Sequence, residues 1–362
     1  MERGMGATPV YMFLHHPSVF SSRSGLQPLV EALGGTPVYY DMTWSRLQGQ
    51  SWTLGQLLRT WGNRYYGSTW NALVPWRDEC RFARSTRGGT GALAHFLWGE
   101  FASPRRRRWT NRFSAVIGTF HCSARRQPSV LGQFRCLHAY DWISVMSKTQ
   151  IPFIVAAGFP EARIRTILHG VDAGYYSPPP AAPQVTGALR CVLVGSTERD
   201  HEFMADVMRR LPPGTATLDL CTSAEYHGLY RGAAGVNLHG RLADEALRDL
   251  YRNAELMLMP LLDSTANNSL LEAMACGTPV LTNNVGGVPE YVGAGAGFIT
   301  DGKNVDEWVD RLCALHRDRS VLSGMRAGVR AWAERFSWDL VAPQYRKLYA
   351  DAGQASDLRV RA

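Results

Sequence analysis

The sequence lacks the features that mark several large protein classes. It contains no run of about 18 apolar residues, the length that a membrane-spanning helix requires. The first twenty residues, MERGMGATPVYMFLHHPSVF, hold only a short apolar segment with two histidines, which argues against a signal peptide. Hydrophobic residues make up 45% of the chain and charged residues 19%, as in ordinary globular proteins. We therefore expect a globular protein of the cytoplasm.

Cysteine is scarce, and its spacing does not suit a disulfide framework or a zinc site. The seven cysteines are odd in number, scattered and free of C-x-x-C spacing. This pattern indicates reduced, mostly buried thiols in a cytoplasmic protein. The sequence also has no Asp-x-Asp motif and no cluster of His and Cys with metal-ligand spacing. We therefore expect chemistry that does not depend on a bound metal.

Lysine is nearly absent, because Lys148, Lys303 and Lys347 are the only three in a chain with 39 basic residues. Genome composition explains such a bias, so it carries no functional conclusion. The distribution of arginine is more informative: residues 44–135 contain fifteen arginines and three acidic residues, whereas the net charge of the whole chain is only +8. Eight of the eleven tryptophans lie in or just beyond this basic stretch, between residues 44 and 142. This part of the chain could meet an anionic partner, or it could be a solvated basic face with tryptophans in the core.

Strands and helices alternate through the first half of the chain. Short apolar runs that end in a loop predict strands at 10–14, 37–40, 115–120, 142–145 and 164–168. A helical pattern from Ser24 to Leu33 separates the first two strands, which is how a parallel, doubly wound sheet begins. Residues 42–110 are rich in Trp and Arg and show no clean period.

The second half repeats the alternation. Strands are predicted at 191–194, 216–220, 235–238, 256–259 and 279–281. Helices are predicted at 200–211, 244–253 and 268–276, and after Asn304 and Ser320. Between the halves, residues 173–188 contain four prolines, a composition that suits a stiff linker.

A chain of 362 residues is long for one hydrophobic core. The pattern predicts an α/β protein with two doubly wound, Rossmann-like domains. We place the first domain at 1–172, the linker at 173–188, the second domain at 189–335, and a last helix with a tail at 336–362.

Glu272 stands alone inside the apolar run LLEAMA. Its helical neighbours at three and four residues are Asn268, Ser269, Ala275 and Cys276, none of which is basic. Either its carboxylate points to solvent, or a group outside the helix binds it.

Ligands of open α/β sheets bind beyond the carboxyl ends of the strands, where the next helices begin. The predicted helix 268–276 follows such a strand and a loop, and Asn267 or Asn268 can cap its start. The N–H groups of a helix start bind anions, and a carboxylate one turn further can accept hydrogen bonds from ribose hydroxyls. The arrangement suits a nucleotide.

Several segments together resemble retaining GT-B glycosyltransferases of family 4, also called group 1. Residues 270–292, LLEAMACGTPVLTNNVGGVPEYV, resemble the motif that lines the sugar-nucleotide pocket of this family. ILHGVD at 167–172 resembles the junction between the two domains, RLADEALRDLYRNAE at 241–255 a helix of the second domain, and FSWDLVAPQYRKLY at 336–349 the last helix. The resemblance implies a GT-B fold, in which two Rossmann-like domains face a cleft and the C-terminal helix crosses back to the first domain.

The resemblance also implies roles for residues of the second half. Glu272 matches the Glu that holds the ribose, while Asn267, Asn268 and Ser269 would offer amides to the diphosphate and the sugar. The family has another Glu eight residues before Glu272, and here that position is Ser264, preceded by Asp263. Either Asp263 replaces that catalytic Glu, or the sugar is held differently.

Four more residues are expected at the donor. The family neutralises the diphosphate with an Arg and a Lys in the segment VGSTERDHEF; here Ser196 stands where that Arg is usual, so Arg199 is the candidate replacement and His201 a weaker one. An exposed loop cation is the alternative for Arg199. Arg241 and Leu242, at the start of the segment that resembles the family helix, are further donor-binding candidates.

In the first half, His121 ends a predicted strand and resembles the family His that reaches the donor sugar near the reacting carbon. A core or capping histidine is the alternative. Ser24 and Gly25 resemble the small-residue loop that lets the backbone approach the donor phosphates.

The resemblance implies transfer of a sugar from a nucleotide-diphosphate sugar to an acceptor with retention of configuration, and without a cofactor. Two other readings stay open: a GT-B phosphorylase or epimerase, and a non-catalytic binder of nucleotide sugars or polyanions. The basic, Trp-rich stretch indicates an anionic or lipid-linked acceptor, or an anionic membrane surface at the inner face of the membrane, met partly through Arg105–Arg108. Nucleic acid fits less well, because no recognition motif accompanies these residues.

Overall fold

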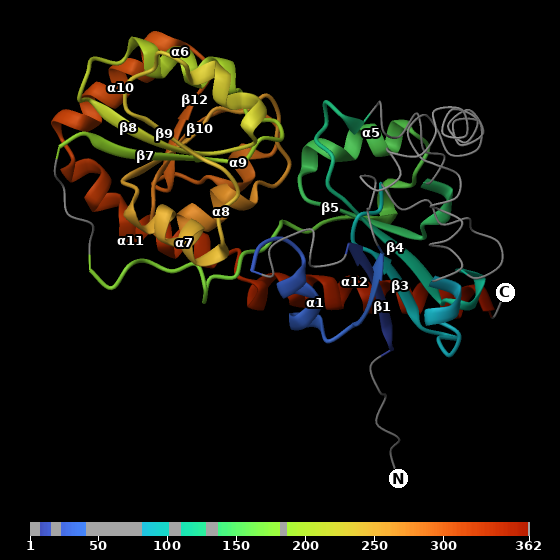
Figure 1. Cartoon of the computed structure of the whole chain (residues 1–362). Helices are drawn as coiled ribbons and strands as arrows, with labels where there is room; N and C mark the ends of the chain where they lie inside the picture. Colours follow the sequence, from blue (N-terminus) through green and yellow to red (C-terminus); the bar gives the residue numbers. More distant parts are fainter. Residues whose placement is uncertain are drawn as a thin grey trace, which may run out of the picture. The chain divides into compact units, whose positions relative to one another are not determined.

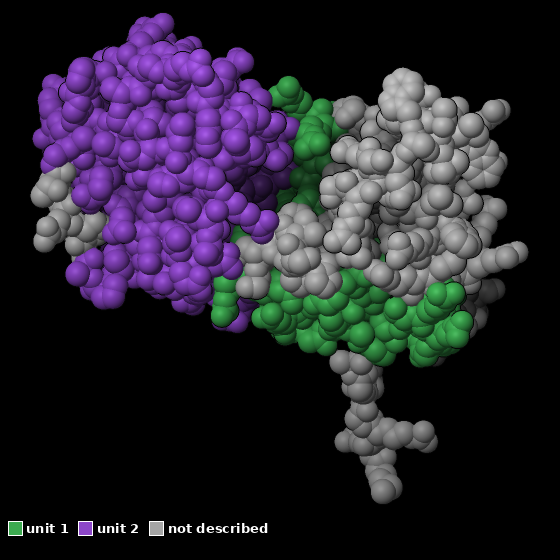
Figure 2. Space-filling model, viewed as in Figure 1, with its two compact units in different colours: residues 1–168, 341–362 green, residues 169–340 purple. Residues whose placement is uncertain are grey.

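A computed structural model describes residues 8–15, 23–40, 82–100, 110–127, 137–181 and 187–360. The chain divides into two compact units (Figure 2). Unit 1 consists of Met1–Leu168 and Val341–Ala362, and unit 2 is His169–Leu340.

The sheet of unit 1 is parallel and has six strands. They are β1 (Val10–His15), β2 (Thr36–Tyr40), β3 (Leu93–Phe96), β4 (Ala115–Phe120), β5 (Trp142–Val145) and β6 (Ile164–Thr166). The strand order is β2-β1-β3-β4-β5-β6, and each neighbouring pair is parallel. The labelled helices of this unit are α1 (Gln27–Leu33), α5 (Ile151–Ala156) and most of α12 (Trp338–Val360), and a further helical turn spans residues 82–85. Short 3-10 turns lie at Thr110–Arg112, Leu137–Ala139, Lys148–Gln150 and Glu161–Arg163.

Strands β3, β4 and β5 of unit 1 are buried along their whole length. All six residues of β4 are buried, which explains why AVIGTF reads as a continuous apolar run and not as an alternation. Helices α1 and α12 lie together beside the sheet (Figure 1), and Arg346 of α12 donates to the Ala32 carbonyl at 2.5 Å.

A buried polar network joins α12 to the sheet of unit 1. His95 of β3 contacts the Tyr349 hydroxyl of α12 through Nδ1 and the Thr119 hydroxyl through Nε2, each at 2.7 Å. Thr119 in turn lies 2.6 Å from the Ser144 hydroxyl. Burial lowers the pKa of His95 to about 3, so the imidazole is neutral, with one nitrogen donating and the other accepting.

The sheet of unit 2 is also parallel and has six strands. They are β7 (Leu189–Val194), β8 (Ala216–Cys221), β9 (Val236–His239), β10 (Leu256–Met259), β11 (Val280–Asn283) and β12 (Gly297–Thr300). Its helices are α6 (His201–Arg210), α7 (Asp244–Asn253), α8 (Asn268–Ala275), α9 (Val288–Tyr291), α10 (Val305–Arg317) and α11 (Ser320–Glu334), and a 3-10 segment spans Ala224–Tyr230. The strand order is β12-β11-β10-β7-β8-β9, so the chain changes direction across the sheet between β7 and β10.

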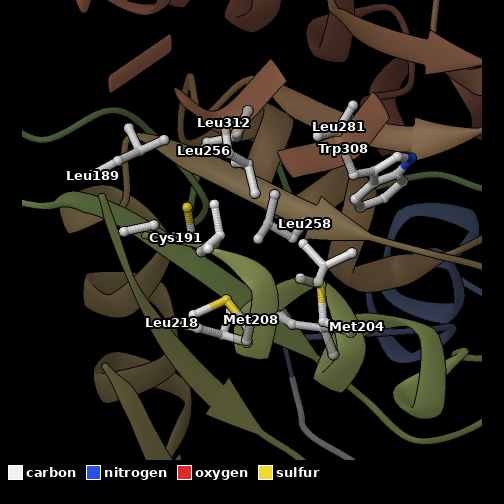
Figure 3. Packing of buried hydrophobic residues seen from close by; sticks show 14 of the residues in the cluster. Leu189, Cys191, Met204, Met208, Leu218, Leu256, Leu258, Leu281, Trp308 and Leu312 are labelled. Atoms are coloured by element: carbon white, nitrogen blue, oxygen red, sulfur yellow. The ribbon is translucent and has the colours of Figure 1, made fainter. Parts of the chain in front are cut away.

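Helices cover both faces of this second sheet. Figure 1 shows α6 and α10 on one face and α7, α8 and α11 on the other. Under α6 and α10 the apolar side chains form one cluster, with Trp308 completely buried against leucines of the central strands (Figure 3). The predicted linker residues that the structure describes belong to unit 2, where Arg330 of α11 donates to the carbonyls of Tyr176 at 2.7 Å and Ala173 at 2.9 Å.

Most of the elements predicted from the sequence are present. Strands β4, β5 and β10 and helix α7 have the predicted bounds. The first helix begins at Gln27 and not at Ser24, because Pro28 fits the first turn of a helix and the residues before it form a turn. Strands β3 and β12 and helix α5 were not predicted. Of the cysteines that the structure describes, four are buried and Cys313 is half-buried, and all five are free thiols.

Candidate functional site

Two loops meet at the carboxyl edge of the unit 2 sheet, at the point where the strand order changes direction. One follows β7 (residues 195–200) and the other follows β10 (residues 260–267). Backbone hydrogen bonds tie them together: Asp200 N donates to the Pro260 carbonyl, and Leu262 N donates to the Glu198 carbonyl, both at 2.9 Å. In open α/β sheets this is the place where ligands bind.

Helix α8 begins at this junction, and Asn267 is its N-cap. The Asn267 side-chain oxygen accepts a hydrogen bond from Leu270 N at 3.3 Å and from the Ser269 hydroxyl at 2.8 Å. Asn267 was one of the two caps that the sequence predicted, and the structure confirms it. The helix start therefore presents backbone N–H groups in the geometry that binds an anion.

Arg199 brings a positive charge to the same helix start. Its Nη2 atom donates to the Asn267 side-chain oxygen at 2.9 Å and to the Ser269 hydroxyl at 2.8 Å, and its Nε donates to the Val194 carbonyl at 3.2 Å. A β-carbon at Gly195, which has a φ of +101°, would lie 2.8 Å from this guanidinium. The left-handed backbone favours glycine here, and a β-carbon would require the guanidinium of Arg199 to shift. The alternative of an exposed loop cation is wrong, since this side chain is packed into the junction.

Glu272 lies one turn further along α8 and is buried, with 3% of its surface exposed. Its Oε2 atom accepts a hydrogen bond at 3.0 Å from the hydroxyl of Tyr251, a completely buried residue of α7. Burial and the nearby Glu272 carboxylate raise the pKa of Tyr251 well above its ordinary value, so its hydroxyl remains a donor. The solvent-exposed alternative for Glu272 is therefore wrong: a neighbouring helix supplies a partner and fixes the carboxylate in place.

Asp263 and Ser264 end the loop after β10, and both are buried. Asp263 Oδ1 accepts a hydrogen bond from Ser264 N at 2.7 Å, and the Ser264 carbonyl accepts one from Gly287 N at 2.7 Å. Gly286 approaches so closely that a β-carbon there would lie 2.5 Å from Asp263 Oδ1. The loop after β11 therefore holds the pair beside the α8 start. Whether Asp263 replaces the family Glu stays a prediction.

The remaining donor-binding candidates of unit 2 are His201, Asn268, Arg241 and Leu242. Both ring nitrogens of His201 face groups of the protein, the Tyr230 hydroxyl at 2.9 Å and the Gly195 carbonyl at 3.1 Å. Burial lowers the pKa of His201 to about 4, so it is neutral and braces the loop after β7 instead of supplying charge. Asn268 is half-buried at the start of α8; Arg241 is exposed and Leu242 half-buried after β9. Their contact with a ligand stays a prediction.

His121 follows β4 in unit 1 and is half-buried. Its Nε2 atom lies 2.6 Å from the Leu97 carbonyl, and because a carbonyl only accepts, the proton is on Nε2. The imidazole stacks on Trp98, with ring centroids 3.9 Å apart. Ser24 and Gly25 form a half-buried turn before α1, and Gly25 has a φ of +78°.

The expectations about metal sites, membrane-spanning helices and the basic segment can be compared with the structure only for the residues that it describes. Within this described part of the chain, no group of three His, Cys, Asp or Glu side chains could hold a metal ion. The search of the same residues found no helix long and apolar enough to cross a membrane. Arg105–Arg108 and most of segment 42–110 lie outside the described residues.

The sequence interpretation missed Tyr251, Gly195 and Gly286, which support the site without standing out in composition. Tyr251 carried a signal, because it is the Tyr of the segment 241–255 that resembles a family helix. The two glycines lie in segments that the resemblance covers, but only the packed structure shows which neighbours they approach.

Comparisons with known proteins agree with this geometry. Residues 181–318 match the family model described as "Glycosyl transferases group 1". Among curated proteins, the D-inositol 3-phosphate glycosyltransferase of Xylanimonas cellulosilytica is 35% identical over 255 residues, which are 62% of this chain and 60% of that protein. The protein of the same name from Streptomyces bingchenggensis is 36% identical over 109 residues, which are 30% of this chain and 24% of the relative. The match thus spans less than two thirds of these relatives.

Solved structures show the same architecture. Sucrose-phosphate synthase from Thermosynechococcus elongatus superposes with a TM-score of 0.73 at 17% identity, over 96% of this chain and all of that chain. HepE of Anabaena, solved in complex with UDP and glucose, superposes with a TM-score of 0.71 at 15% identity, over 95% of this chain and all of that one. The fold is GT-B, as predicted, and the resemblance to group 1 glycosyltransferases is confirmed.

Proposed function

We propose that this protein is a glycosyltransferase that moves a sugar from a nucleotide-diphosphate sugar to an acceptor. The observation that carries the proposal is the assembly at the α8 start. Arg199, from the loop after β7, contacts the capped backbone N–H end of this helix, and the buried Glu272 carboxylate lies one turn further along it. The matched family segment, 181–318, contains all three of these features. A structural neighbour with the same fold binds UDP and glucose, which supports a nucleotide sugar as donor.

In this proposal each group acts on one part of the donor. The N–H groups of α8 and the guanidinium of Arg199 bind the diphosphate, and Glu272 accepts hydrogen bonds from the ribose hydroxyls while Tyr251 holds its second oxygen. As the bond from the sugar to the diphosphate breaks, negative charge develops on the leaving oxygen. Fixed donors that already point to this position stabilise the charge without reorganisation.

We further propose retention of configuration and independence from metal. The acceptor oxygen would form its bond to the anomeric carbon on the face that the diphosphate leaves, through an oxocarbenium-like path, and its proton would pass to the departing phosphate. His121 would contact the donor sugar, and Asp263 would take the place of the family Glu that Ser264 lacks. The family resemblance supports both features.

The acceptor in this proposal carries negative charge. Two observations support it: the curated relatives are named for a phosphorylated acceptor, inositol 3-phosphate, and residues 44–135 hold fifteen arginines against three acidic residues. An anionic membrane at the inner face would attract the same residues, at about 1 kcal/mol for each Arg near the surface.

Replacing Arg105–Arg108 with serine tests this charge. We expect a higher KM for an anionic acceptor, or release from vesicles of phosphatidylserine and phosphatidylcholine at low salt, with the donor KM unchanged. The variant with serine at four exposed arginines of unit 2, Arg209, Arg210, Arg231 and Arg317, removes the same number of charges and controls for a change in net charge alone. If the wild type ignores such vesicles and uses neutral acceptors as well as the variant does, the basic stretch is only a solvated face.

A panel of nucleotide sugars tests the reaction class. The wild-type protein is incubated with each donor, with and without phosphorylated and neutral polyol acceptors, and nucleoside diphosphate release and glycoside formation are measured. A glycosyltransferase releases diphosphate together with an acceptor-dependent glycoside, and retention is tested by whether the anomeric configuration of that glycoside is unchanged. Sugar phosphate formed from inorganic phosphate would identify a phosphorylase, an epimerised sugar an epimerase, and binding without turnover a non-catalytic binder.

A further inference from the structure

The turn after β3, Leu97–Glu100, lies at the carboxyl edge of the unit 1 sheet. Strand β3 lies between β1 and β4. Because β2 lies on one side of β1 and β3 on the other, this turn is next to the point where the strand order changes direction. Gly99 N donates to the Thr119 carbonyl at 2.8 Å, and the Tyr140 hydroxyl donates to the Gly99 carbonyl at 2.7 Å. The turn is thus held against β4 by hydrogen bonds from both sides.

Glu100 ends this turn, and its carboxyl group is buried, with 1% of the residue exposed. Its Oε1 atom accepts hydrogen bonds from the backbone N–H groups of His121 and of Cys122, the latter at 2.6 Å. Its Oε2 atom is buried without a hydrogen-bond partner among the described residues. A buried carboxyl with one unpartnered oxygen is costly to a fold, which favours a functional reason for its presence.

The same turn holds His121 in two further ways. The Leu97 carbonyl accepts a hydrogen bond from the imidazole at 2.6 Å, and Trp98 stacks on the ring with an interplanar angle of 17°. Three residues of one short turn therefore fix the backbone, the tautomer and the ring plane of one histidine.

We propose that Glu100 is a positioning residue of the transfer reaction, whose Oε1 atom clamps the His121–Cys122 backbone and thereby sets the imidazole of His121 for the donor sugar. This inference rests on the proposed function, because it assigns His121 a part in that reaction. Burial raises the pKa of Glu100 to about 7, and Oε1 remains an acceptor in both the protonated and the ionised form. The clamp therefore needs an oxygen at this position, not a charge.

Three substitutions separate the oxygen from the charge. Glu100→Gln keeps an oxygen at the same distance, Glu100→Asp keeps the acid but withdraws it by one methylene, and Glu100→Ala removes both. Glu161→Gln, at an exposed glutamate of the same unit, is the matched control. For the full chain, we would measure kcat and donor KM with the best donor of the nucleotide-sugar panel, and by NMR the hydrogen exchange of the His121 and Cys122 amides.

We expect the Asp and Ala variants to lose at least tenfold in kcat with donor KM within about twofold, and to exchange both amides at least tenfold faster. The Gln variant and the control should match the wild type in all three quantities. Should the Ala variant fail to fold, the Gln and Asp pair decides the question.

Two results overturn the proposal. One is a Gln variant as impaired as the Ala variant, because the charge and not the clamp would then matter. The other is unchanged amide exchange or unchanged kcat in the Asp and Ala variants of an active enzyme. Failure of the proposed function looks different: the wild type transfers no sugar from any donor, although the amide exchange still follows the expected order.

Discussion

Arg199 shows how much of the candidate donor site depends on single side chains. Burial lowers its pKa to about 10, so it is still a cation at neutral pH, in surroundings that favour the charge less than water does. Its acceptors in the protein include a side-chain amide, a hydroxyl and backbone carbonyls, all of them neutral groups. An incoming diphosphate would supply the opposite charge that these neutral partners lack. In the proposed function, the Arg199 guanidinium is therefore held in place before the diphosphate binds.

His121 permits a test at the same scale. It belongs to unit 1, whereas the candidate nucleotide site lies in unit 2. We expect His121→Ala to lower kcat by tenfold or more, about 1.4 kcal/mol of barrier, because a group near the reacting carbon acts in the transition state. Affinity for the nucleoside diphosphate, measured by calorimetry, should change by less than about twofold. A variant that keeps kcat within about threefold would identify this histidine as structural.

Among the elements, α8 belongs both to the core and to the candidate functional site. Every residue from Ser269 to Ala275 is buried, so the helix is part of the core, yet its first turn is the candidate anion site. Arg326 and Arg330 of α11 donate to the carbonyls of Cys276 and Ala275 at its other end, at 3.4 and 2.7 Å. Positive groups at the helix C-terminus agree with the helix dipole and keep α8 fixed.

Asn267, the N-cap of α8, should contribute both to the stability of the fold and to the affinity for a nucleoside diphosphate. Asn267→Ala removes an N-cap, which costs about 1 kcal/mol of unfolding free energy. It also removes an acceptor of Arg199, so nucleoside diphosphate affinity should fall severalfold. Asn304→Ala is the matched control, because Asn304 caps α10 by accepting hydrogen bonds from Asp306 N and Glu307 N. This variant should lose a similar unfolding free energy in denaturant titrations and keep the wild-type affinity for the nucleoside diphosphate. Equal affinities for the two variants would contradict a ligand role for the α8 start.

The sequence predicted correctly those elements whose hydrophobic pattern follows from burial alone. β4, β10 and α8 were predicted correctly because neighbouring elements bury them, so their sequences are continuous apolar runs. β3 was missed because its four residues, LAHF, include the buried His95, whose hydrogen bonds to Tyr349 and Thr119 come from distant parts of the chain. A local sequence pattern cannot predict partners that lie so far away in the chain.

The same limit applies to the site. The motif around Glu272 indicated its position on a helix after a loop, and Arg199 was identified from its place after a strand. The Tyr251 hydroxyl and the clamp by Glu100 follow only from packing, since Glu100 lies 21 residues before its partner His121. In the sequence interpretation Glu100 counted only as one of three acidic residues in a basic stretch.

At the scale of the whole molecule, three of the histidines that the structure describes are buried and neutral. Burial lowers the pKa to about 3 for His95 in unit 1 and to about 4 for His169 and His201 in unit 2. In unfolded chains these groups titrate at their ordinary value near 6.5. Between these two pH values the unfolded state binds more protons, so the stability of each unit falls as the pH is lowered through this window.

We therefore expect acid to destabilise unit 2 more than unit 1. Between pH 6.5 and 4.5 each such histidine costs its unit about 3 kcal/mol of unfolding free energy, at about 1.4 kcal/mol for each pH unit, and unit 2 has two of them. Glu100 acts in the opposite direction in unit 1, because its pKa is raised to about 7 and its burial cost disappears on protonation. Pulse proteolysis from pH 7.5 to 4.5, read by mass spectrometry, should show fragments of unit 2 first. Simultaneous loss of both units, or equal stability across this range, would contradict this account of the histidines.

The central claim, that the start of α8 is a nucleotide site with Glu272 on the ribose, is tested most directly by calorimetry with a nucleoside diphosphate. We expect Glu272→Ala to weaken binding at least tenfold, because charge-assisted hydrogen bonds to the ribose hydroxyls are worth about 1.5–3 kcal/mol each. Glu307→Ala, at an exposed glutamate of α10, should bind like the wild type. A folded Glu272→Ala protein with wild-type affinity would contradict the claim.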